Sequence, residues 1–142
     1  MKILFLAVCL VSLIGCRPQD ATPSTPATSK LAVSKVTMNG ILLKQGVLKG
    51  VGHTAVGTAT IYDFLGKKYV VLDPFSSQNG PDLWVYLSRD INATDYIRLG
   101  KLQSTMGSQL YEVPGTTDIV RYGFVHIWCE KYTVVFARAE LN

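Results

Sequence analysis

Cysteine is scarce in this chain, which holds three in 142 residues: Cys9, Cys16 and Cys129. No Cys-x-x-Cys pair and no Cys-x-x-Cys-His run is present. The sequence therefore excludes a dithiol oxidoreductase and covalently attached haem. Beyond Cys16 the possible metal ligands include one cysteine and the two histidines, His53 and His126. This set is too small for a structural zinc site, which needs about four ligands.

The sequence also lacks an apolar run of about 20 residues, the length that crosses a bilayer as a helix. The run from Ile3 to Ile14 follows Lys2 and is interrupted only by Ser12, a pattern typical of a signal peptide. It ends in Leu-Ile-Gly-Cys at residues 13–16, which resembles the lipobox of bacterial lipoproteins. We therefore expect residues 1–15 to be a lipoprotein signal peptide and Cys16 to carry lipid. An ordinary secretory signal that ends in cysteine is the alternative.

The residues after Cys16 have almost no apolar side chains and are rich in Pro, Ser and Thr. Such a composition buries too little apolar surface to fold, so we expect residues 16–37 to be a disordered tether. About 20 residues of flexible chain reach roughly 25 Å, and two or three acyl chains give lasting membrane attachment. The membrane is thus an expected partner, and the cell envelope the expected location. Arg17 after the lipid-bearing cysteine implies the periplasmic side of the outer membrane in a Gram-negative cell.

Clusters of positive charge are missing. The formal net charge is +4, yet Lys67 and Lys68 are the only adjacent basic residues. A nucleic-acid-binding surface needs a basic patch or stripe, so we expect no nucleic-acid partner. No nucleophile elbow is present either, and the sequence assigns no catalytic residue.

Helical periodicity beyond a single turn is absent from the rest of the chain, apart from one short turn expected near residues 90–96. Eight β-branched and aromatic runs stand there instead, separated by Gly, Pro, Asn and Asp. We expect residues 38–142 to form an all-β domain, an antiparallel two-sheet β-sandwich, with a closed β-barrel as the alternative. The third run is expected to stop at Pro74. The expected strands are residues 40–50, 53–64, 67–75, 82–90, 95–102, 108–114, 119–129 and 131–141.

Four ordered blocks resemble the DM13 domain: GHTAVGTATIY, LDPFSSQNGPDLWVYLS, DYIRLGKLQSTMGSQLYEVP and VHIWCEKYTVVFARAEL. The resemblance runs from about Gly40 to the C-terminus. It implies a β-rich extracytoplasmic domain with a role in electron transfer, in which Cys129 is the proposed redox centre. The family also occurs beside DOMON domains, which bind haem or sugars. Haem is therefore a candidate cofactor, with His53 and Trp128 as candidate neighbours, and a separate redox or envelope protein is the expected partner.

The residues themselves leave the role of Cys129 open. Side chains alternate along a strand, so Cys129 shares a face with Val125 and Ile127 and points away from His126, which argues against a copper site built on that pair. One hypothesis is a redox or electron-transfer module that uses Cys129. The other is a non-catalytic binding or interaction module in which Cys129 is a structural core residue, since free cysteine is among the most buried residue types.

Overall fold

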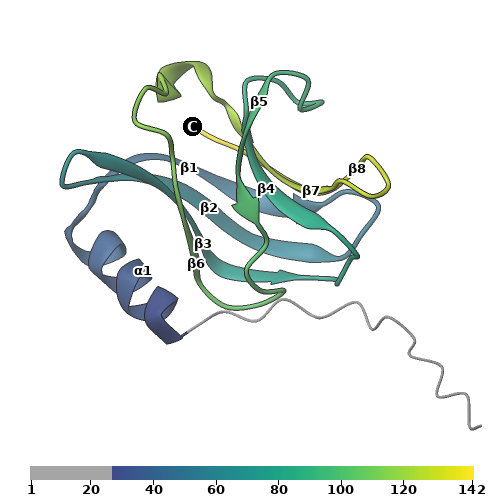
Figure 1. The fold of residues 1–142 in the computed structure, drawn as a ribbon, viewed down its shortest axis with the longest axis horizontal. Coiled ribbons are helices and arrows are strands. Elements are labelled where there is room, and N and C mark those ends of the chain that lie inside the picture. The colour runs from purple at the N-terminus through teal and green to yellow at the C-terminus, as the bar shows by residue number, and fades with distance from the viewer. Residues whose placement is uncertain (1–26) are drawn as a thin grey trace, which may run out of the picture.

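A computed structural model of the chain describes residues 27–142. The expected signal peptide, Cys16 as the expected site of lipid attachment, and the start of the expected tether lie outside the described residues. One α-helix precedes eight strands and a 3₁₀-helix (Figure 1). In chain order the elements are α1 (Ala27–Asn39), β1 (Ile41–Gly50), β2 (Ala55–Phe64), β3 (Lys67–Ser77), β4 (Leu83–Ser88), β5 (Tyr96–Lys101), β6 (Gln109–Glu112), η1 (Ile119–Arg121), β7 (Phe124–Cys129) and β8 (Val134–Glu140).

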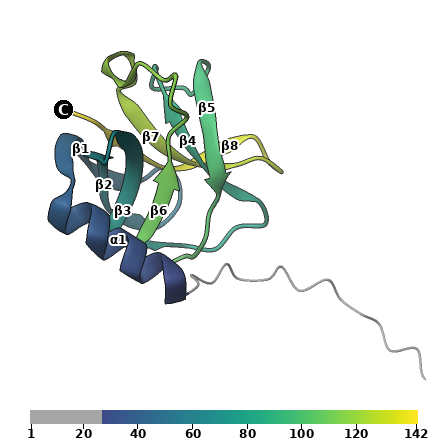
Figure 2. The ribbon, with the colours of Figure 1, turned by 60° about the vertical axis from the view of Figure 1, so that its left-hand side comes forward.

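The eight strands form one antiparallel sheet in the order β5-β4-β7-β8-β1-β2-β3-β6. The sheet curves until its two edge strands, β5 and β6, lie close to each other (Figure 2). The prediction of an all-β, antiparallel domain is confirmed, and each of the eight predicted runs contains one strand. Because one nearly closed sheet takes the place of two separate sheets, the arrangement matches the barrel alternative.

A buried glutamine on β6 fixes the connection between β5 and β6. The Oε1 atom of Gln109 accepts hydrogen bonds from the backbone N–H of Gln103 at 3.1 Å and of Ser104 at 3.2 Å, and from the Tyr111 hydroxyl at 2.7 Å. Its Nε2 atom donates to the carbonyl of Ser104 at 2.8 Å. Burial raises the pKa of Tyr111, so its hydroxyl stays protonated as a donor. The connection from β5 is thus fastened to β6 by side-chain bonds.

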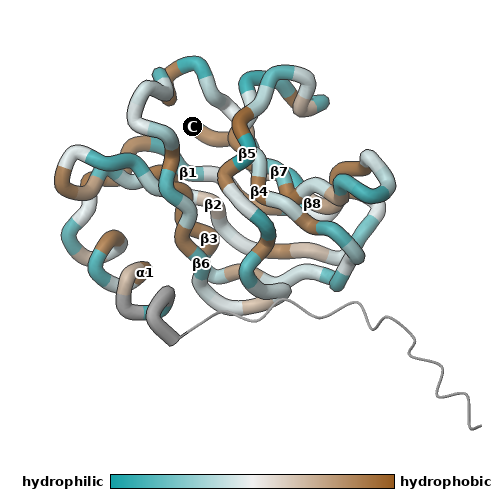
Figure 3. Tube along the Cα trace, viewed as in Figure 1, coloured by the Kyte–Doolittle hydropathy of each residue, from teal (hydrophilic) through white to brown (hydrophobic). Residues whose placement is uncertain are grey.

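The core lies inside the curved sheet, and alternation along the strands determines which residues reach it. On β4 and β7 the inward residues face each other across the pairing, for example Val85 opposite Ile127 and Leu83 opposite Cys129. Figure 3 shows hydrophobic residues along the strands and mainly hydrophilic ones in the connecting loops. Cys129 shares a face with Val125 and Ile127, as predicted, and this face points into the core.

The helix α1 corrects the expected tether, which was to extend through residue 37. Val33 and Val36 are three positions apart, so they share one face of the helix, and both are buried. They pack against Val71 on β3 and against partly buried side chains of β2, β3 and β6, namely Tyr62, Phe64, Tyr69 and Leu110. The polar composition hid this apolar pair, whose burial holds the segment on the barrel (Figure 2). Within residues 27–142, no helix combines the length and the apolar character needed to cross a membrane.

Two strand boundaries also differ from expectation. β3 does not stop at Pro74 but continues to Ser77. Proline is tolerated there because the pairing of β2 with β3 is irregular between Gly57 and Ala59, and a bulge does not require every N–H of the ladder. The seventh run opens with the 3₁₀-helix η1, so β7 begins only at Phe124.

The packing of α1 predicts the effect of a charge at Val36. Replacing Val36 with Asp places a charge against buried apolar side chains and lowers the free energy of unfolding by about 2 kcal/mol or more. The matched control is Ser34→Asp on the exposed face of the same helix, expected to change stability by about 0.5 kcal/mol or less. Urea denaturation followed by tryptophan fluorescence measures both. Equal effects of the two substitutions would show that α1 does not pack on the barrel.

Candidate functional site

Four aromatic side chains gather on the outer face of strands β4, β5 and β7. Trp84 and Tyr86 point outward from β4, because their neighbours on the strand point into the core, and Trp128 pairs with Trp84 across β4 and β7. The Tyr86 ring stacks on Tyr96 of β5 with 4.3 Å between centroids, and on Trp128 with 5.9 Å. We call Trp84, Tyr86, Tyr96 and Trp128 the aromatic cluster.

Tyr86 is joined to a carboxylate and a guanidinium. Its side chain is only 1% exposed, and its hydroxyl donates a hydrogen bond of 2.5 Å to Oε1 of Glu130. The Nε atom of Arg98 lies 2.8 Å from the same oxygen. Burial raises the pKa of Tyr86, and the bond to Glu130 raises it further, so the phenol keeps its proton at physiological pH. Phenol, carboxylate and guanidinium thus form one connected group.

Trp84 is flanked by two cations. The guanidinium carbon of Arg98 lies 5.5 Å from its ring centroid, and Nζ of Lys101 lies 5.4 Å away. Its indole N–H donates to Oδ1 of Asp82 at 2.9 Å, and Asp82 is 3.4 Å from Lys101. Cations within about 6 Å of an aromatic face are attracted to it, so these contacts hold the Trp84 ring in place.

Cys129 lies on the other side of β7 from the aromatic cluster. Its side chain is 0% exposed and packs in the core, with Leu83 and Val134 as its partners in the strand pairing. The predicted redox role of this thiol is not tested by its position and stays a prediction. Its surroundings are those of an apolar core residue.

His53 and Trp128, the two predicted neighbours of a cofactor, do not lie together. His53 follows β1, and its ring stacks on Phe136 with 3.6 Å between centroids. Trp128 stands on the outer face with Tyr86. The three residues singled out in the sequence therefore occupy three surroundings: a ring stack for His53, the outer face for Trp128 and the core for Cys129.

The predicted ligands can be tested for their fit to haem, which needs an axial ligand that faces a hollow. Three hollows on the surface of the described residues have volumes of about 680, 330 and 330 Å³. Neither Cys129 nor His53 lines any of the three, and Trp128 borders the second. These residues do not fit haem as axial ligands. Among residues 27–142, no three or more His, Cys, Asp or Glu side chains are grouped where they could hold one metal ion.

His126 is buried on the outer side of β7, under the loop that joins β4 to β5. Its Nε2 atom lies 2.9 Å from the Ser88 hydroxyl. The Asp90 carboxylate fixes the loop by accepting backbone hydrogen bonds from Asn92, Thr94 and Asp95, and these bonds lower the pKa of Asp90 to about 2. Burial lowers the pKa of His126 to about 4, so its ring is neutral at pH 7.

The sequence pointed to part of the aromatic cluster only. It named Trp128 as a site neighbour, and the alternation of residues 83–88 placed Trp84 and Tyr86 on one face of a strand. It missed Arg98 and Glu130. These two residues meet Tyr86 only through the pairing of three strands, and no local pattern in the sequence shows that pairing.

Comparison with known families gives one match: the family model described as electron transfer DM13 matches residues 47–141. This span excludes α1 and includes Cys129 and the whole aromatic cluster. Comparison with curated proteins and with solved structures gave no match.

The burial of His126 predicts how stability depends on pH. The folded protein takes up a proton on His126 only near pH 4, whereas the unfolded chain does so near the ordinary value of 6.5. The unfolded chain therefore binds more protons between these values, and stability falls as the pH drops from 6.5 to 4, by up to roughly 1.4 kcal/mol per pH unit from this group. His126→Gln removes this part of the slope, as measured by urea denaturation from pH 7 to pH 4.

The control for this experiment is Val120→Gln, at an exposed position of η1, which is expected to follow the wild-type pH profile. Parallel profiles for wild type and His126→Gln would contradict the prediction, whatever the stability of the variant at pH 7.

Proposed function

The chain belongs to the DM13 family. From this premise we propose that it is an electron-transfer module at a membrane surface, in which the aromatic cluster gives up one electron to a partner and takes one back. The observation that carries the proposal is the stack of Tyr96, Tyr86 and Trp128, whose central ring, Tyr86, is a phenol bonded to a carboxylate. Tyr96 is 40% exposed, so a partner protein that docks on this face can contact the stack directly.

Burial favours the aromatic cluster over the thiol. Thiol exchange and sulfenic acid formation both need a sulfur atom that a reactant can touch. Cys129 is sealed in the core, whereas an electron can reach a partner through stacked rings without any atom changing place. In this proposal Cys129 fills the core, and the partner is a separate redox protein of the envelope.

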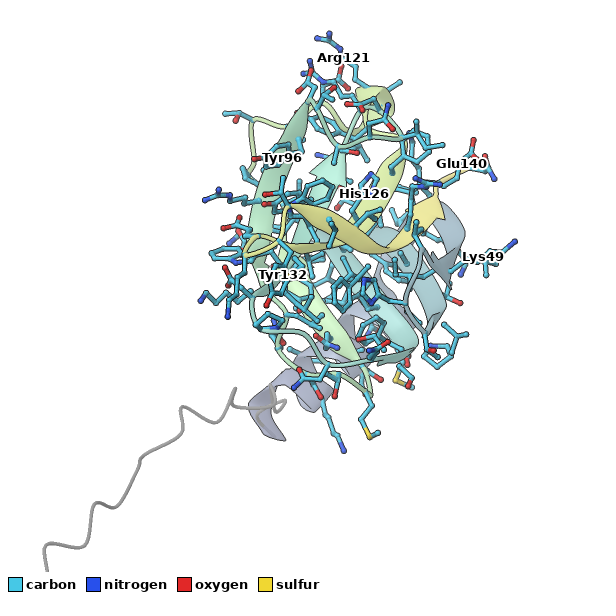
Figure 4. All side chains as sticks on the ribbon, turned by 90° about the vertical axis from the view of Figure 1, so that its right-hand side faces the viewer. Lys49, Tyr96, Arg121, His126, Tyr132 and Glu140 are labelled. Carbon is cyan, nitrogen blue, oxygen red and sulfur yellow. The ribbon has the colours of Figure 1, made fainter. Side chains whose placement is uncertain are left out.

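A polar groove favours a second candidate function, that of a binding module. The groove has a volume of about 680 Å³ and lies over β1, β2 and β8. Lys49 and Arg138 supply positive charge and Glu140 supplies negative charge, and Figure 4 shows Lys49 and Glu140 on the same side of the molecule. A polar envelope polymer would suit this lining, and Cys129 would again be structural.

We also propose that Cys16 carries lipid and holds the domain at the envelope membrane. Because α1 begins at Ala27, ten residues, 17–26, separate Cys16 from the folded domain. Ten residues span at most about 35 Å, so the barrel would stay close to the bilayer surface.

The lipid anchor predicts the behaviour of a Cys16→Ser variant. Wild type is expected in the membrane fraction, with an N-terminal peptide whose mass includes a diacylglyceryl group on Cys16. Cys16→Ser is expected to lose that mass and to leave the membrane fraction, because no acyl chain remains to be buried. Cys129→Ser serves as the control and should fractionate as wild type does. Membrane association of the Cys16→Ser variant, or an unmodified Cys16 in the wild type, would contradict lipid anchoring.

Flash oxidation by a photogenerated ruthenium(III) complex tests whether the aromatic cluster is the electron donor. Wild type and Cys129→Ala are expected to form the same yield of aromatic radical in transient absorption, since the thiol is not the donor. A variant with Phe at all four cluster positions should form severalfold less. Tyr132→Phe is the control, because Tyr132 is exposed and lies outside the aromatic cluster. If Cys129→Ala were the only variant that failed to form an oxidised species, Cys129 and not the aromatic cluster would be the electron donor.

A further inference from the structure

Oxidation of a phenol differs from that of the other aromatic side chains because the proton must leave with the electron. A phenol that has lost an electron is a very strong acid. A neutral phenol is therefore oxidised readily only when a base already contacts its O–H group and can take the proton. Such a base must lie within hydrogen-bond reach, about 2.6–3.2 Å or closer. The question within the aromatic cluster is therefore which of its two phenols, Tyr86 or Tyr96, has a base in that position.

Tyr86 meets this requirement. Its hydroxyl is 2.5 Å from Oε1 of Glu130, and it is only 1% exposed, so water does not compete for the bond. Arg98 lies 2.8 Å from the same carboxylate oxygen, and this charge-assisted contact holds the carboxylate against the phenol. The raised pKa of Tyr86 leaves the proton on the phenol until an electron is removed.

The neighbouring rings are poorer donors. Arg98 and Lys101 lie 5.5 and 5.4 Å from the centroid of the Trp84 ring, and their positive charge opposes the loss of an electron from it. The Tyr96 side chain is 40% exposed and lies beside Arg98, whose guanidinium is a donor and cannot accept a proton. Tyr96 and Trp128 still stack on Tyr86 and can pass an electron between it and the surface.

We propose that Tyr86 is the one-electron donor of this domain and that Glu130 is the acceptor of its phenolic proton. The step begins when a one-electron oxidant, a high-potential metal centre of a partner docked on the Tyr96 side, takes one electron. The phenolic O–H bond of Tyr86 breaks, and the proton bonds to Oε1 of Glu130. The products are a neutral tyrosyl radical, a neutral carboxylic acid and the reduced oxidant, and return of the electron reverses both transfers.

This inference rests on the proposed electron-transfer function, and a kinetic experiment on the full chain in detergent separates the two. The probe is photogenerated ruthenium(III) tris(bipyridine), and transient absorption distinguishes tyrosyl from tryptophanyl radicals. Tyr86→Phe is expected to reduce the tyrosyl yield severalfold, while Tyr96→Phe retains most of it. Glu130→Gln, which keeps the side-chain shape but cannot take the proton, should slow tyrosyl formation by on the order of 100-fold.

Glu112→Gln is the matched control, because Glu112 pairs with Lys67 on the surface and lies outside the aromatic cluster. Glu130→Asp restores a carboxylate and should recover part of the rate. In the wild type itself, where folding is not in question, tyrosyl formation should be slower in D₂O than in H₂O, because the O–H bond breaks in the same step.

The outcomes that oppose the inference are distinct. A radical that forms on tryptophan, with a yield unchanged in Tyr86→Phe, overturns the assignment of Tyr86 and leaves the proposed function standing. An unchanged rate in Glu130→Gln together with equal rates in H₂O and D₂O overturns the role of Glu130. A wild type that forms no radical in the aromatic cluster overturns the proposed function itself.

Discussion

The pairing of β4 with β7 is the constraint on which the site depends. This register places Trp84 beside Trp128 on the outer face and Leu83 beside Cys129 in the core. It continues past the end of β7, where the N–H of Glu130 bonds to the carbonyl of Asp82 at 3.0 Å and the Glu130 side chain reaches Tyr86. Because side chains alternate with a period of two, a slip of one residue would turn the thiol outward and the aromatic rings inward.

The rest of the fold keeps this face rigid and open. The bonds of Gln109 fasten the connection that follows β5 to β6, and β5, which carries Tyr96 and Arg98, is paired with β4. The helix α1 covers β2, β3 and β6, on a different side of the barrel from the aromatic cluster (Figure 2). An anchor attached before α1 would therefore leave the aromatic cluster free to meet a partner.

Alternation and turn residues made the strands predictable, and alternation also placed Cys129 on the face of Val125 and Ile127. The helix was missed because Val33 and Val36 gain their stability from rings on β2 and β3, which lie far away in the sequence. The closed sheet was predicted only as the alternative to a sandwich. The side-chain bonds of Gln109 fix the connection between β5 and β6, and the strand pattern of the sequence does not reveal these bonds. Glu130 was missed because its partner, Tyr86, lies 44 residues away in the sequence.

The central claim is that an oxidised domain holds its unpaired electron on a tyrosine of the outer face and not on the buried sulfur. Electron paramagnetic resonance of the freeze-quenched, singly oxidised full chain tests this most directly. We expect a neutral tyrosyl spectrum that narrows when the protein is grown with ring-deuterated tyrosine. A spectrum that is unchanged by the deuterated tyrosine, or one with the character of a sulfur-centred radical, would contradict it.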